Sequence, residues 1–167
     1  MRYKEWTTKI PEEITTDALW RMNVYRYALF LADVAWNDVN KLSKNKLLIS
    51  SCDQLYRSAG SVSANISEGY SRRSNLDQAR FYEYALGSAR ECRGWYFKVR
   101  HKMNKQILDS RLELITEIIK MLLYIVPNQR GSKISEPEVT YLNNENPNSL
   151  IIEEMNIYSI ALNPKEY

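Results

Sequence analysis

Two carboxylates, Glu68 and Glu91, are the side chains of this chain that best fit acid–base chemistry. Paired carboxylates can serve as general acid and general base. No nucleophile, phosphate-binding loop or Glu-x-x-His repeat accompanies them in the sequence. The single histidine, His101, lies in the basic run RHKMNK, where we expect a surface side chain. We therefore predict no catalytic residue, cofactor or metal, and we expect each carboxylate to pair with an arginine.

The two cysteines also fit a structural role better than a chemical one. Cys52 and Cys92 fall on apolar helical faces, where a free thiol behaves as a small hydrophobic group. The chain has 167 residues, enough for one domain, and no apolar run long enough to span a membrane. Its N-terminus, MRYKEWTTKIPEEI, lacks the continuous apolar stretch of a signal peptide. We expect a cytoplasmic protein that does not bind a membrane.

The charge is divided unevenly along the chain. Residues 1–130 hold 21 Lys+Arg against 14 Asp+Glu, a net of +7. Residues 131–167 hold 2 against 6, a net of −4. A basic body with an acidic tail predicts an anionic partner for the body.

Four segments show the apolar spacing of helices, at about 17–42, 46–71, 75–104 and 111–126. Ser74 with Asp77 predicts the start of the third helix, and Ser110 with Glu113 predicts the start of the fourth. Pro127 is expected to end the fourth helix. Because the connections are short, we predict an all-α, antiparallel, up-down-up-down four-helix bundle.

The apolar seams of the two middle helices advance by alternating steps of four and three residues. The second helix places Leu48, Cys52, Leu55, Ala59, Val62 and Ile66 on its seam. The third helix places Phe81, Ala85, Ser88, Cys92, Trp95 and Val99 on its seam. We predict that the bundle covers residues 16–127, between an extended N-terminal arm at 1–15 and an acidic linker and tail at 128–167.

A second stripe of mostly short polar residues follows each of these seams. On the second helix it comprises Gln54, Ser58, Ser61, Asn65, Glu68 and Arg72, and on the third Arg80, Tyr84, Gly87, Glu91, Gly94 and Lys98. Glycine inside a helix costs about 1 kcal/mol relative to alanine, so close approach of another backbone would explain it. We favour a second helix–helix contact, within or between subunits. The alternative is a solvated flank in which Glu68 and Arg72 form a weak i,i+4 pair.

Basic residues gather on the same two helices. Residues 57–105 hold ten Lys+Arg against four acids, a net of +6. Besides Arg57, we take these cations as candidate nucleic-acid-binding residues: Arg72, Arg73, Arg80, Arg90, Arg93, Lys98, Arg100, Lys102 and Lys105. Because no base-reading motif is present, the sequence favours recognition of RNA or DNA by charge and shape.

Two motifs in this region resemble those of a known family. QLYRSAGSVSANISEGYSRRS and ARFYEYALGSARE resemble the second- and third-helix signatures of proteins encoded by intervening sequences of bacterial 23S rRNA genes, also called the S23 family. The residues that carry the match, besides Ile66 and Arg72, are Arg57, Ser61, Asn65, Glu68, Gly69, Phe81, Ala85, Gly87, Ser88 and Glu91.

The resemblance implies more than a fold. The family includes the accessory variability determinant of diversity-generating retroelements, a ring-like homopentamer that associates with a reverse transcriptase and binds nucleic acid. By this resemblance we expect a non-enzymatic homopentamer, with structural or interface roles for Arg57, Ser61, Asn65, Glu68, Gly69, Gly87, Ser88 and Glu91. The expected partners are other subunits, RNA or DNA, and a reverse transcriptase. The alternative is a protein-interaction ring of the rRNA branch that does not bind nucleic acid.

Overall fold

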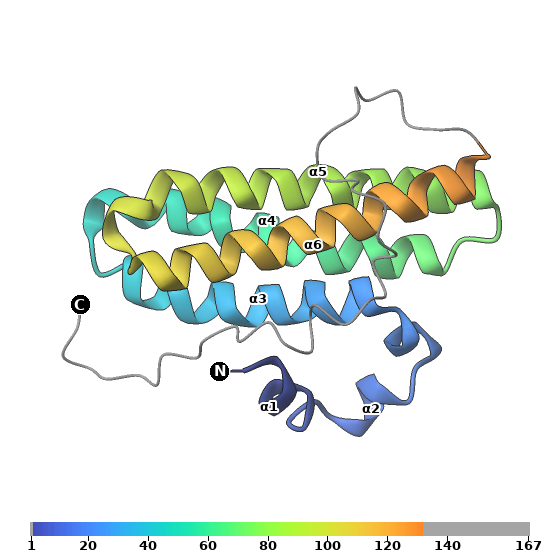
Figure 1. Ribbon diagram of the computed structural model, residues 1–167, viewed down its shortest axis with the longest axis horizontal. Helices are drawn as coiled ribbons and strands as arrows, with labels where there is room; N and C mark the ends of the chain where they lie inside the picture. Colours follow the sequence, from blue (N-terminus) through green and yellow to red (C-terminus); the bar gives the residue numbers. More distant parts are fainter. Residues whose placement is uncertain (1, 132–167) are drawn as a thin grey trace.

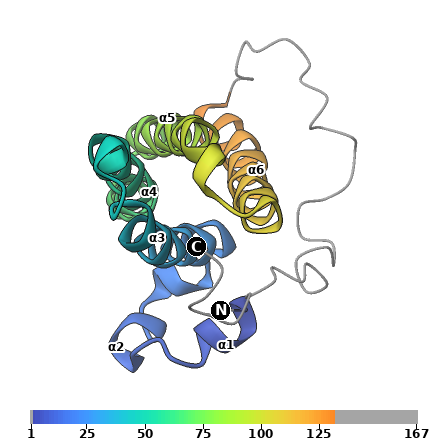
Figure 2. The same ribbon diagram turned by 90° about the vertical axis from the view of Figure 1, so that its left-hand side faces the viewer.

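Four long helices lie side by side: α3 (Asn23–Leu42), α4 (Ile49–Tyr70), α5 (Asn75–Val99) and α6 (Lys105–Arg130). They belong to a computed structural model that describes residues 2–131 of the chain. Each helix runs antiparallel to the one before it (Figure 1). Figure 2, a view from one end, shows the order α3, α4, α5, α6 around a shared interior. The predicted up-down-up-down bundle of four helices is confirmed.

The apolar seam of α4 is the main reason that this helix packs where it does. Cys52, Leu55, Ala59, Val62 and Ile66 are all buried, as their spacing predicts. Leu48, at the start of the predicted seam, precedes α4 and is only half-buried. Each large apolar side chain moved out of water contributes about 1.5–3 kcal/mol, so the α4 seam is a major source of stability.

The buried face of α5 is rotated slightly from the predicted seam. Its core positions include Tyr82, Ala89 and Tyr96, together with the predicted Cys92 and Val99. The predicted seam residues Phe81, Ser88 and Trp95 are half-buried at the edge of this face. The rotation arises because alanines let α5 approach its neighbours closely, while the Tyr96 hydroxyl finds a polar partner inside the bundle.

The ends of α6 differ from the prediction. The helix begins at Lys105, because the Asn104 side chain accepts a hydrogen bond from the backbone N–H of Gln106 at 2.8 Å. Ser110 is not a cap, since it lies inside the helix and its hydroxyl donates to the carbonyl of Ile107.

Pro127 does not end the helix either, which continues to Arg130. A proline so near the end removes only one intrahelical hydrogen bond. The helix ends at Gly131, whose φ of 69° is the left-handed conformation that glycine adopts easily.

Each of the other three predicted helices divides into an α-helix and a short 3-10 helix, which in the second is the turn Lys46–Leu48 before α4. Asp17 caps a 3-10 turn, Ala18–Arg21, that precedes α3. At the far end of α5, a 3-10 turn at Arg100–Lys102 leads to α6. The Ser74 cap is confirmed, since its hydroxyl accepts a hydrogen bond from the N–H of Asp77 at 3.1 Å.

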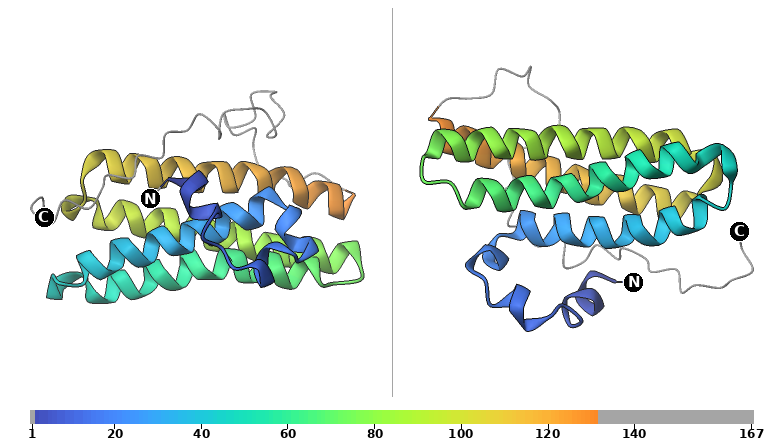
Figure 3. Two further views of the ribbon diagram at one scale, coloured as in Figure 1. Left: turned by 90° about the horizontal axis from the view of Figure 1, so that it is seen from below. Right: turned by 180° about the vertical axis from the view of Figure 1, so that it is seen from behind.

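The N-terminal segment is not the extended arm that the sequence predicts. It forms two short helices, α1 (Tyr3–Thr7) and α2 (Glu12–Thr15), beside α3 (Figure 3). Trp6 is buried, its indole N–H donates to Asp33, and its ring lies 5.3 Å from the ring of Phe30. The aromatic residues of this segment therefore extend the core. The predicted tail from residue 132 onward lies outside the described residues.

Candidate nucleic-acid interface and signature surface

The polar stripe of α4 passes from the interior to the surface as the helix proceeds. Ser58 is buried and donates to the carbonyl of Leu55, and half-buried Asn65 donates to the carbonyl of Ser61 at 2.8 Å. Farther along, Glu68 and Arg72 form an ion pair in which both side chains are about half exposed. Within one subunit, Glu68 therefore forms the exposed i,i+4 pair that the sequence offered as the alternative to burial.

The matching stripe of α5 lies on the outer side of that helix, where all six of its residues are exposed. A Cβ atom added to Gly87 or Gly94 would have nothing within 4 Å. No other part of the described chain therefore approaches these two glycines. Glu91 accepts a hydrogen bond from the Trp95 indole N–H at 3.2 Å and faces solvent.

Gly69 is the signature glycine whose small size the bundle itself requires. A Cβ added there would lie 2.8 Å from Cε1 of Tyr82 and 3.0 Å from Cβ of Phe81. This close approach lets the end of α4 pack on the first turns of α5. The Arg72 guanidinium then lies over the Phe81 ring, 4.5 Å from its centroid. Gly69 is therefore a packing residue within the subunit.

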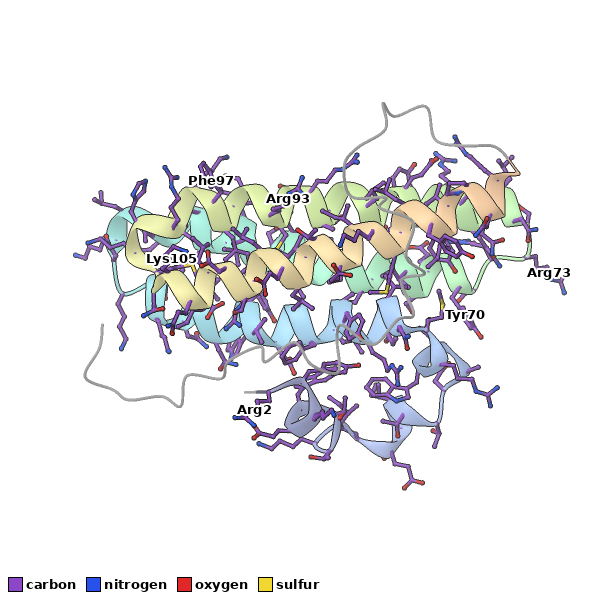
Figure 4. The ribbon with its side chains drawn as sticks, in the orientation of Figure 1. Arg2, Tyr70, Arg73, Arg93, Phe97 and Lys105 are labelled. Carbon is purple, nitrogen blue, oxygen red and sulfur yellow. The ribbon has the colours of Figure 1, made fainter. Side chains whose placement is uncertain are left out.

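The nine candidate nucleic-acid-binding cations do not form one compact patch. Figure 4 shows Arg73 at the turn between α4 and α5, and Lys105 at the opposite end of the bundle. Arg93 lies on α5 between them, close to the half-exposed Phe97. The cations therefore follow the length of α5 from one end of the bundle to the other.

Several of these cations rest on aromatic rings. The Lys98 ammonium lies 3.6 Å from the Trp95 ring centroid, and the Arg100 guanidinium lies 3.9 Å from that of Phe97. Arg80 donates to the Tyr84 hydroxyl at 2.8 Å. A cation over an aromatic face gains about 0.5–1 kcal/mol at an exposed site, which holds the side chain in place while its charge still faces water.

Sequence reasoning missed the one strongly buried ion pair of the described chain. On α3, Asp38 accepts from Arg111 of α6 at 2.8 Å and from the Tyr96 hydroxyl at 3.0 Å. Burial alone would lower the pKa of Arg111, but the neighbouring Asp38 raises it overall. Burial is the main cause, and the negative charge of Asp38 the next, that raises the pKa of Tyr96 well above its ordinary value. The Tyr96 hydroxyl therefore stays protonated and remains a hydrogen-bond donor. The signal was present, since Asp38 lies four residues beyond the apolar position Val34.

The cysteines are single buried thiols, as predicted. Burial raises the pKa of Cys92 to about 12, although the neighbouring Ser58 side chain acts in the opposite direction. Within residues 2–131, no three His, Cys, Asp or Glu side chains gather as metal ligands. No helix in that range is long and apolar enough to cross a membrane.

The fold and this surface define a basic four-helix-bundle protein. The chain belongs to the family of 23S rRNA-intervening sequence proteins, whose model matches residues 21–124. It is similar to a crystal structure of a protein with unknown function from the S23 ribosomal protein family of Bacteroides thetaiotaomicron. The two are 26% identical with a TM-score of 0.59, and the match covers 62% of this chain and 97% of that chain. No curated protein matches the chain. The N-terminal segment, 2–20, lies outside the family match.

Proposed function

We propose that this protein is a non-enzymatic, oligomeric scaffold that binds nucleic acid through the basic side of its bundle. The observation that carries the proposal is the excess of cations from α4 through α5 to the start of α6, where ten Lys+Arg stand against four acids in residues 57–105. Counterion release from a phosphate backbone makes such a surface bind without reading bases. The exposed ring of Phe97 beside Arg100 adds a stacking surface for an unpaired base.

The oligomer is the second part of the proposal. The signature residues Gly87 and Glu91 face outward, as does Gly94 farther along the same stripe, and no described part of the subunit covers them. Helical glycines that lack a reason within their own subunit favour a neighbouring backbone at that face. In a homopentamer the basic side would recur five times, and weak phosphate contacts would add together.

Titration with nucleic acid tests the proposal directly. Fluorescence anisotropy would follow labelled structured RNA and duplex DNA with the full chain over a salt series, and light scattering would give the particle mass. We expect affinity to fall steeply with salt, and a mass of about five chains. If neither ligand binds at low salt, the proposal is overturned in favour of a ring that binds proteins only.

The finer role that we propose is an accessory subunit of a reverse transcriptase in a diversity-generating retroelement. The family resemblance supports it, and an enzyme of that kind would bring its template RNA to the basic side of the ring. Co-expression with a reverse transcriptase encoded beside the gene tests this role. We expect the two proteins to purify together, and separate elution would contradict the role while leaving nucleic-acid binding intact.

A further inference from the structure

Two turns that are far apart in the sequence lie at the same end of the bundle. The turn from α3 to α4 and the turn from α5 to α6 share the left-hand end in Figure 1, which faces the viewer in Figure 2. We call this the basic end and define it by residues 41–48, KLSKNKLL, and 98–105, KVRHKMNK. These segments hold seven Lys+Arg and no Asp or Glu: Lys41, Lys44, Lys46, Lys98, Arg100, Lys102 and Lys105. Lys41, Lys44 and Lys46 lie outside residues 57–105, the stretch in which the sequence concentrates its cations.

Five of the seven cations of the basic end are exposed, whereas Lys41 and Arg100 are half-buried. Lys44, Lys46 and Lys102 are exposed, and no ion pair engages their side chains among the described residues. Lys105 pairs with Asp109 at 2.6 Å, yet its side chain remains 88% exposed. Like charges gathered at one end of the bundle repel one another, so an anion bound there relieves an unfavourable field.

The opposite end of the bundle differs in charge balance. There, at the turn from α4 to α5, Arg72 pairs with Glu68. Arg130, at the end of α6, pairs with Glu83 at 3.1 Å. Asp77 lies in the first turn of α5, next to Arg73 and Arg80. Cations and carboxylates are therefore nearly balanced at that end, and it attracts polyanions less than the basic end does.

We propose that the basic end is the principal phosphate-binding surface of this protein, so that the bundle stands end-on to the backbone of a folded RNA or a duplex. The inference rests on the proposed nucleic-acid binding and specifies where it occurs. It adds Lys41, Lys44 and Lys46 to the contact surface and makes Arg72 and Arg73 secondary. Charges from two turns give a broad surface rather than a linear row, which suits two backbone strands across a groove better than one extended strand.

Salt dependence of binding tests this assignment with two matched variants of the full chain. The first is K44Q/K46Q/K102Q at the basic end, and the second is R72Q/R73Q/R80Q at the opposite end; each removes three exposed cations. Each phosphate contact contributes about 0.7–0.9 to the slope of log affinity against log salt. We expect the first variant to lose about 2–3 from that slope, and the second to lose about 1 or less.

The outcomes of this titration distinguish failure of the inference from failure of the proposed function. Light scattering and circular dichroism on both variants separate lost contacts from lost assembly or folding. If wild type binds RNA or DNA and the two variants lose equal slope, or the second loses more, the basic end is not the principal surface while nucleic-acid binding stands. If wild type binds neither RNA nor DNA, the proposed function fails together with this inference.

Exposed Leu47 and Ile49 also lie at the basic end, so vesicles that contain anionic lipid are a further ligand to test. Binding to vesicles alone would replace both proposals with a membrane-surface role.

Discussion

The two sides of this bundle are held together by different means. The α4–α5 side is the tighter one, where Gly69 and several alanines let two helices approach closely. The α3–α6 side has fewer close approaches, and its interior contains the Asp38–Arg111–Tyr96 network. The family signatures lie on the tight side, yet many of their polar residues face outward. The packing of one subunit therefore explains Gly69 but not Gly87 or Glu91, and the proposed contacts between subunits would account for those two positions.

Breaking the buried ion pair should give the largest effect. Asp38→Ala leaves the Arg111 guanidinium buried without its carboxylate, and such a loss costs about 3–5 kcal/mol of unfolding free energy. Chemical denaturation followed by circular dichroism would measure the loss. The matched control is Asp53→Ala, because Asp53 is exposed and lies 3.9 Å from Arg57, so we expect a change below about 0.5 kcal/mol.

A double replacement sharpens this prediction. Asp38→Leu combined with Arg111→Met removes both charges, so neither is left unpaired in the interior. We expect the double variant to recover most of the stability lost by Asp38→Ala. A double variant as unstable as the single one would mean that the network stabilises the α3–α6 side through its geometry rather than through charge compensation.

The second prediction concerns the close approach on the tight side. Gly69→Ala places a Cβ 2.8 Å from the Tyr82 ring and 3.0 Å from the Phe81 Cβ, so either the Tyr82 ring or the backbone of the two helices must shift. We expect a loss of about 1–3 kcal/mol in unfolding free energy, because overpacking forces backbone shifts. The control is Gly60→Ala, where the added Cβ meets nothing within 4 Å and better helix propensity should raise stability. Equal behaviour of the two variants in denaturation would refute the packing role.

The sequence predicted this tight side better than the other. Apolar spacing located all four helices, and the α4 seam from Cys52 to Ile66 is buried as predicted. Apolar periodicity alone does not reveal the buried ion pair, although Asp38 lies four residues beyond the apolar position Val34. The spacing of Ser110 and Glu113 predicts a helix from Arg111, whereas Asn104, nearer the turn, is the cap that the chain uses. Local patterns cannot decide between two such caps, since the choice depends on which apolar residues the longer helix buries.

For the candidate site, the sequence located the cations but not their grouping. Lys44 and Lys46 lie more than fifty residues before Lys102 in the chain, and only the antiparallel topology brings their turns to one end. Conversely, Arg72 and Lys105 lie in the single basic stretch and come to opposite ends. The length of a helix separates charges that lie in one stretch of the sequence, which is why the predicted cations spread along the bundle and do not form one compact patch.

A third prediction tests whether the outward face of α5 packs on another subunit. Replacing Gly87 and Gly94 by alanine adds no clash within the chain and favours the helix by about 1 kcal/mol per site. We nevertheless expect the particle mass from light scattering to fall, because the added methyl groups would separate two backbones in close contact. A more stable particle of unchanged mass would show that this face remains in solvent.

The smallest expected effect concerns the Glu68–Arg72 ion pair at the end of α4. Glu68 and Arg72 are both about half exposed, so Glu68→Ala should cost less than about 1 kcal/mol in a single subunit. In the assembled particle the same change has a larger effect if a neighbouring subunit covers the pair, since a covered arginine would lose its partner. Comparing denaturation at low and high protein concentration separates the two contributions. A small effect that does not depend on concentration would place Glu68 at the free surface, and the signature would then require another explanation at this position.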